Sequence, residues 1–147
     1  MPFNTERMAK VKIAIGLLVA SLVLLVIYGA DAAVASSSPD RRGFLPFDES
    51  VRGSGFGGGA VIMSIIAFVI ARKEPSRAVM ALLFVNGGLI IAGMLALIAQ
   101  GALASENSSG AMRTIGSTIG MGAILVGLGA WKAAGDRRIA SKPQASR

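Results

Sequence analysis

Hydrophobic residues fill four long blocks of this chain, and none of the blocks contains a charged side chain. The blocks cover residues 13–30, 53–71, 78–105 and 114–131, and each holds at least 18 residues. An α-helix needs about 20 residues to cross the roughly 30 Å hydrocarbon layer of a membrane. In lipid, a helix satisfies its backbone hydrogen bonds within the segment. The pattern therefore predicts an all-α integral membrane protein, a bundle of four transmembrane helices.

The pattern within the first block separates a membrane helix from a soluble one. Between residues 17 and 27 only Ser21 is polar, so apolar side chains cover every face of the predicted helix. A helix on the surface of a soluble domain keeps one polar face. The mean hydropathy of +0.64 and the hydrophobic share of 53% agree with the membrane interpretation.

Turn-forming and charged residues place the boundaries within a single four-pass domain covering residues 1–147. Pro75 stops the second helix, and Ser76 is a suitable N-cap for the third. The link between these helices is short, which predicts that they are antiparallel neighbours. We expect helices at about 10–33, 51–72, 76–105 and 110–134, an outer loop at 36–50 and a basic C-terminal tail at 135–147.

Basic residues gather on one side of the bundle if the four helices alternate in direction. Of the 15 Lys and Arg residues, all but Arg41, Arg42, Arg52 and Arg113 precede the first helix, lie in the link 72–77 or follow the fourth helix. The positive-inside rule then places both termini in the cytoplasm, with the chain in the plasma membrane. Attraction to anionic lipids on that side accounts for the net charge of +7 without a nucleic-acid partner.

The first block has a second interpretation, a cleaved signal peptide. A basic start, an apolar core and the small residues at 33–35 fit that pattern. Cleavage would leave three helices and an N-terminus on the outer side. The apolar run continues with small residues as far as Ala35, which favours a retained first helix.

Composition argues against catalysis by this chain alone. It has no Cys and no His, which excludes thiolate or imidazole metal sites and Cys–His or Ser–His nucleophile pairs within it. The predicted spans offer only Ser, Thr, Asn, Gln and Tyr as polar groups. We therefore expect no catalytic residue, no metal site and no cofactor.

Asn86 is the one amide near the middle of a predicted span. It precedes Gly87 and Gly88 in the third helix. A buried amide in lipid commonly hydrogen-bonds a neighbouring helix and fixes the packing. It can also line a polar path for a transported solute. The sequence leaves both roles open.

The fourth helix carries the clearest spacing in the chain. Gly116, Gly120, Ala123, Gly127 and Ala130 recur at steps of four and three residues, which puts them on one face. Small residues let helices approach closely in lipid, so this face is predicted to pack against another helix of this chain or of a partner. Gly122 and Gly129 lie off that stripe and form a second face for close approach.

Two outer segments carry further candidate residues. Phe44, Leu45 and Phe47 place an apolar cluster in the outer loop, where it either docks a partner or dips into the lipid interface. Asn107 begins an Asn-Ser-Ser sequence that fits the glycosylation pattern, and the predicted topology puts it on the permitted side.

Uncharged helices with small-residue faces indicate a non-catalytic accessory subunit that associates with other integral membrane subunits. The alternative is a small oligomeric transporter or channel with its polar site at Asn86. The Met-Pro-Phe-Asn start, four Gly/Ala-rich spans and lack of Cys and His resemble the small accessory membrane subunits of archaeal ammonia monooxygenase. That resemblance covers the general layout and implies a copper-dependent membrane complex whose metal lies in other subunits.

Overall fold

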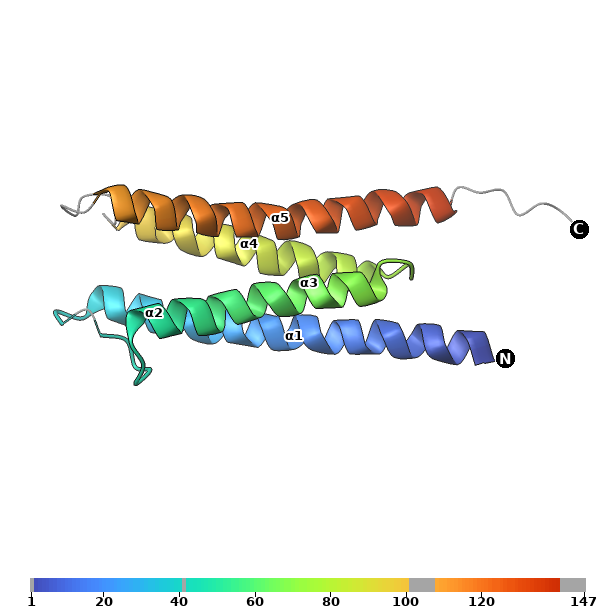
Figure 1. Cartoon of the computed structure of the whole chain (residues 1–147), viewed down its shortest axis with the longest axis horizontal. Coiled ribbons are helices and arrows are strands. Elements are labelled where there is room, and N and C mark those ends of the chain that lie inside the picture. The colour runs from blue at the N-terminus through green and yellow to red at the C-terminus, as the bar shows by residue number, and fades with distance from the viewer. Residues whose placement is uncertain (1, 41, 101–107, 141–147) are drawn as a thin grey trace, which may run out of the picture.

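The computed structural model describes residues 2–40, 42–100 and 108–140, and every regular element in these ranges is a helix. In chain order the elements are α1 (Pro2–Ser37), α2 (Glu49–Arg52), the π-helical η1 (Gly53–Gly58), α3 (Gly59–Ala71), α4 (Arg77–Ala99) and α5 (Ser108–Ala140). Arg52, Gly58 and Gly59 keep right-handed helical dihedrals, so α2, η1 and α3 form one continuous helix. The described part of the chain is therefore a bundle of four long helices (Figure 1).

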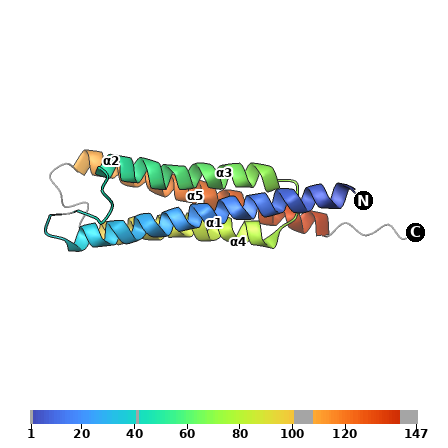
Figure 2. The ribbon, with the colours of Figure 1, turned by 90° about the horizontal axis from the view of Figure 1, so that it is seen from below.

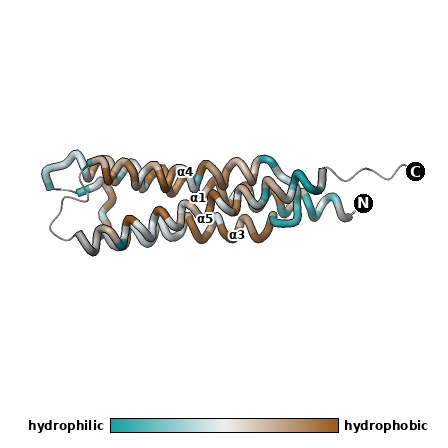
Figure 3. The backbone as a smooth tube through the Cα atoms, turned by 90° about the horizontal axis from the view of Figure 1, so that it is seen from above, coloured by the Kyte–Doolittle hydropathy of each residue, from teal (hydrophilic) through white to brown (hydrophobic). Residues whose placement is uncertain are grey.

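All four of these helices are long and apolar enough to cross a membrane. The qualifying stretches are Asn4–Ser37, Gly53–Ala71, Arg77–Ala99 and Met112–Arg138. Hydrophobic residues predominate along the middle of the bundle (Figure 3), and many of them are exposed. Ile62 and Val69, for example, are each at least 60% exposed. So much exposed apolar surface marks a surface that contacts lipid or another protein.

The helices associate as two pairs. α1 packs along α3, and α4 packs along α5 (Figure 1). The two pairs meet mainly where α1 contacts α4. The buried core lies along these contacts and includes Leu18 of α1, Leu83 of α4 and Leu125 of α5.

The short turn between α3 and α4 begins and ends as the sequence predicts. Ser76 is extended and caps α4, with its hydroxyl accepting a hydrogen bond from Val79 N at 3.4 Å. However, α3 and α4 contact each other only sparsely, although they are consecutive and antiparallel. Serine hydrogen bonds join α3 to α1, and close glycine contacts join α4 to α5. The residues on each helix face, and not the order of the helices in the sequence, therefore decide which helices pack together.

One end of the bundle collects the basic residues. The start of α1, the end of α5 and the α3–α4 turn all lie there (Figures 1 and 2). The loop after α1, which the sequence predicts to be on the outer side, lies at the opposite end. This arrangement agrees with four alternating helices.

Several helices are longer than the sequence pattern indicates. α1 begins at Pro2 and continues to Ser37, and α5 continues to Ala140 instead of ending near residue 134. The extra turns at the basic end carry charged residues such as Glu6, Arg7 and Arg137. Of the predicted third helix, residues 101–105 lie outside the described ranges, as do 141–147 of the predicted tail.

Candidate functional site

Three helices share a buried polar cluster near the middle of the bundle. Asn86 of α4 is fully buried, and its Nδ2 lies 3.1 Å from Ser21 Oγ of α1 and 3.2 Å from Ser64 Oγ of α3. The same nitrogen lies 3.2 Å from the carbonyl oxygen of Leu18. Ser21 Oγ donates to Ala60 O at 2.8 Å. The cluster thus links α1, α3 and α4.

Proton positions in this cluster follow from the contacts. Ser21 uses its hydrogen on Ala60 O, so at the 2.9 Å contact between the hydroxyls Ser64 donates to Ser21. The Asn86 amide nitrogen has two hydrogens for three acceptors, the two hydroxyl oxygens and Leu18 O, so one N–H is shared between two of them. Leu18 O can only accept, which fixes the orientation of the amide. Asn86 Oδ1 points away from these partners and is buried without a hydrogen bond. The cluster therefore has one unused acceptor.

A buried ion pair between Asp31 and Arg52 lies at the end of the bundle opposite the basic end. Asp31 of α1 is 1% exposed, and its Oδ2 accepts from Arg52 Nη1 at 2.6 Å. Its Oδ1 accepts from the backbone N–H of Leu45 at 2.7 Å. A Cβ at Gly43 would collide with the Asp31 carboxylate, so only glycine lets the loop pass this close. Asp31 thus ties the outer loop to α1 and α2.

The tied loop presents two aromatic side chains outward. Phe44 and Phe47 are 55% and 50% exposed, whereas Leu45 is half-buried and contributes its backbone to the contact with Asp31. The Phe47 ring lies 6.5 Å from the Phe56 ring, measured between centroids. Of the three predicted docking residues, the two aromatics are therefore free to meet lipid or a partner, and Leu45 anchors the loop.

A second polar cluster lies at the basic end. Lys132 of α5 is almost completely buried, and its Nζ donates to Glu74 O at 2.6 Å and contacts Asp136 Oδ1 at 3.4 Å. Asp136 Oδ2 accepts from the backbone N–H of Ser76 at 3.2 Å. Glu74 also pairs with Arg7 of α1 at 3.5 Å. These contacts fasten α5 and α1 to the turn between α3 and α4.

The small-residue stripe of α5 faces away from the other described helices. A Cβ built on Gly116, Gly120 or Gly127 meets no atom within 4 Å beyond its own helix, and Ala123 and Ala130 are exposed. The off-stripe glycines make the internal contact instead. The prediction that the stripe packs against a partner is therefore separate from the folding of this bundle.

The close contact between α4 and α5 is made by glycines on both helices. A Cβ on Gly87 would lie 2.8 Å from Gly122 O, and one on Gly122 would lie 3.0 Å from Gly87 O. A Cβ on Gly129 would lie 3.3 Å from the Phe84 ring, a tight contact with a side chain. Of the two faces that the sequence indicates on this helix, the one with Gly122 and Gly129 is the face used within the chain.

Sequence reasoning missed the partners of several polar residues. Ser21 and Ser64 are single polar positions in apolar blocks, and that isolation was the available signal. Asp31 and Arg52 carry opposite charges at adjacent ends of two predicted helices, which could have indicated their pairing. Asn107, the predicted glycosylation site, lies outside the described residues.

The contacts found among the described residues are close packing, hydrogen bonds and ion pairs. No group of three or more Asp or Glu side chains in the described ranges is placed to hold a metal ion. No protein-family model, curated protein sequence or solved structure matches this chain. The contacts above are therefore the basis for a functional proposal.

Proposed function

We propose that this chain is a non-catalytic structural subunit of a multi-subunit membrane protein complex, embedded in the plasma membrane with its basic end in the cytoplasm. The observation that supports this most directly is the outward face of α5. Its small residues form a smooth surface that no described part of the chain covers. A bundle whose internal packing already uses another glycine face does not need this one for its own folding.

Physical chemistry gives such a face a use. Apolar burial does not drive association between helices already in lipid, so close van der Waals packing supplies much of the attraction. Gly116, Gly120 and Gly127 would let the backbone of a partner helix approach α5 closely. The exposed Phe44 and Phe47 provide a second contact surface at the outer end.

The resemblance in layout implies that this complex is a copper-dependent membrane monooxygenase. In that assembly the metal and the reacting groups would belong to other subunits. This chain would contribute helix surface and a fixed outer loop.

Substitution on the stripe tests the proposal. In the native membrane we expect Gly120→Leu and Gly127→Leu each to release the chain from its complex, because a large side chain would separate the two helix backbones. The matched control is Gly93→Leu on α4, where a Cβ also meets no atom within 4 Å. Extraction in mild detergent, native gel separation and mass spectrometry would measure the amount of each variant that remains with the partners.

Two results would contradict the subunit proposal. One is retention of both α5 variants in the complex at wild-type levels. The other is a wild-type chain that runs alone, as a monomer or a small homo-oligomer, after the same extraction.

A second candidate function is solute transport through an oligomer, and the buried Asn86 Oδ1 favours it. An acceptor without a donor is unusual in a protein interior, and such groups often mark functional positions. Wild-type chain in liposomes would then move a solute, and Asn86→Leu would stop the flux. Absence of flux across a panel of ions and small solutes would reject transport.

A further inference from the structure

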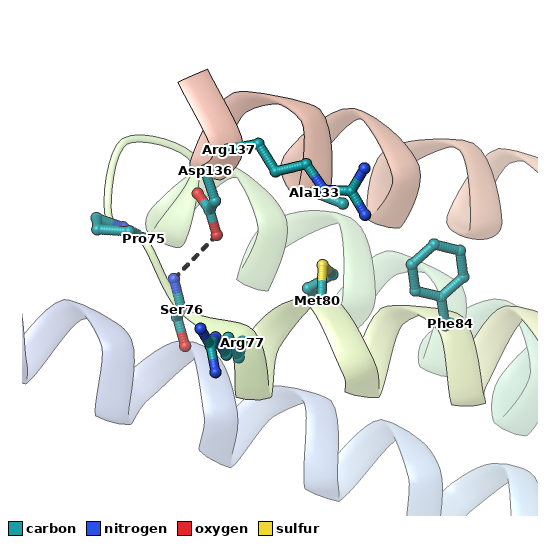
Figure 4. A pocket seen from close by; sticks show the side chains of 8 residues that line it. All are labelled: Pro75, Ser76, Arg77, Met80, Phe84, Ala133, Asp136 and Arg137. Atoms are coloured by element: carbon teal, nitrogen blue, oxygen red, sulfur yellow. Dashed lines mark hydrogen bonds between the residues drawn. The ribbon is translucent and has the colours of Figure 1, made fainter. Parts of the chain in front are cut away.

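A groove runs between α4 and α5 at the basic end of the bundle. It has a volume of about 630 Å³, within the roughly 300–1,000 Å³ that is typical of ligand sites. Ser76 and Arg77 line one end, Met80, Phe84 and Ala133 line the other, and the Arg137 side chain extends from the first end toward Ala133 (Figure 4). The groove is therefore amphipathic along its length.

The polar end of the groove carries positive charge that has no counterpart in the described residues. Arg77 and Arg137 are both exposed, and neither forms an ion pair with an acidic residue of the described ranges. Asp136 also lines the groove, but its carboxylate is engaged by Lys132 and by the backbone N–H of Ser76. The start of α4 adds the partial positive charge of a helix N-terminus. An anion is the ligand that this end favours.

The depth of the groove indicates what kind of anion fits. Arg77 and Phe84 are seven residues apart on α4, so the groove descends about 10 Å along the helix axis at 1.5 Å per residue. The interfacial layer on each side of a bilayer is about 5–8 Å thick, from the difference between its total and hydrocarbon thickness. A ligand at the arginines would lie among headgroups, while one beside Met80 and Phe84 would lie among acyl chains.

We propose that this groove binds one anionic phospholipid. Its phosphate lies at the end formed by Ser76 and Arg77, where the exposed Arg137 side chain reaches it by rotating about its own bonds, and an acyl chain lies against Met80, Phe84 and Ala133. A free phosphate ion would leave the apolar end of the groove unfilled, which is why a lipid is the better occupant. The proposal rests on the membrane embedding in the proposed function but not on the subunit role, because it concerns a different face of the molecule from the α5 stripe.

Lipid titration of the purified full-length chain tests the site. In lipid-free detergent, native mass spectrometry would follow the binding of dioleoylphosphatidylglycerol and, separately, of dioleoylphosphatidylcholine. We expect one phosphatidylglycerol to bind preferentially, and the Arg77→Gln/Arg137→Gln variant to bind it about 30-fold more weakly. This corresponds to about 1 kcal/mol for each arginine, with a tenfold change equal to 1.4 kcal/mol.

The control must change the same charge elsewhere. Arg42→Gln/Arg113→Gln removes two exposed arginines from the opposite end of the bundle and should bind phosphatidylglycerol like the wild type. A third variant, Ala133→Leu, fills the groove without altering charge and should also weaken binding. Circular dichroism melting would confirm that each variant keeps the wild-type fold.

The outcomes separate the lipid from other occupants. Equal binding of both lipids by the wild type, or equal losses in the two double variants, would overturn the proposal. Inorganic phosphate that binds as tightly as phosphatidylglycerol, with Ala133→Leu unchanged, would assign the groove to a free anion instead. A partner protein that displaces the lipid stoichiometrically from the groove in the native complex would also overturn it.

Discussion

Asn86 illustrates how single residues act in this bundle. Its amide nitrogen joins hydroxyls on two other helices, while its oxygen has no donor. Hydrogen bonds between membrane helices contribute about 0.6 kcal/mol on average and up to about 1.7 kcal/mol. The cluster therefore favours one arrangement of α1, α3 and α4 more than it stabilises the bundle as a whole.

A double-mutant cycle would measure that contribution. We expect Asn86→Ala and Ser64→Ala to be coupled by about 0.6–1.7 kcal/mol in the free energy of unfolding, measured by reversible unfolding in mixed detergent micelles. The control pairs Asn86→Ala with Ser117→Ala, because the Ser117 hydroxyl bonds only within its own helix, to Thr114 O. A coupling no larger than that of the control would show that the amide does not hold α4 to α3.

We expect a larger change in the free energy of unfolding when the Asp31–Arg52 ion pair is broken. Asp31→Asn keeps an acceptor for Leu45 N but leaves the mostly buried Arg52 guanidinium without a counter-charge. Breaking a buried pair by removing one partner costs about 3–5 kcal/mol. We expect a loss of that order in the free energy of unfolding, and about 1 kcal/mol or less for Arg7→Gln, whose pair with Glu74 is solvated on the arginine side. Equal losses would contradict the structural role of the outer pair.

At the scale of whole helices, α5 has two glycine faces with different roles. Gly122 lies against the backbone of α4, and Gly120, two residues earlier, has open space beside it. We expect Gly122→Ala to lower the unfolding free energy of the isolated chain by about 1–3 kcal/mol through overpacking. Gly120→Ala should leave it unchanged or raise it by up to about 1 kcal/mol, since Ala favours helix. Thermal unfolding of both variants in the same detergent would compare them, and a larger loss for Gly120→Ala would contradict the assignment of the faces.

The sequence predicts helix existence better than helix pairing. Uncharged blocks of sufficient length indicate four apolar helices because the membrane requirement acts on each block separately. Pairing depends on which glycine meets which backbone, and Gly87–Gly122 is a contact between residues far apart in the chain. Ser21 and Ser64 likewise reveal their role only when α1 and α3 lie side by side. The polar candidate Asn86 was identifiable because it is the only amide at that depth, whereas its partners were not.

At the scale of the whole molecule, the basic residues are distributed unevenly between the two ends of the bundle. Described basic residues such as Arg7, Lys73 and Arg137 belong to the end where α1 starts and α5 finishes, while the Asp31-tied loop lies at the other end (Figure 1). The positive-inside rule acts on such an asymmetry. The buried Lys132 strengthens the basic end structurally, since it joins α5 to the α3–α4 turn without adding an exposed charge.

The absence of cysteine makes the orientation directly testable, because each introduced thiol would be the only one in the chain. Thr5 is exposed near the start of α1 and Asp40 is exposed three residues after its end, so Thr5→Cys and Asp40→Cys report the two sides. We expect a membrane-impermeant maleimide to label Asp40→Cys on intact cells and Thr5→Cys only after lysis. The reverse pattern would overturn the predicted topology. Failure to find a labelled Thr5→Cys chain after lysis, with Asp40→Cys labelled and shorter than full length, would instead favour cleavage of the first helix as a signal peptide.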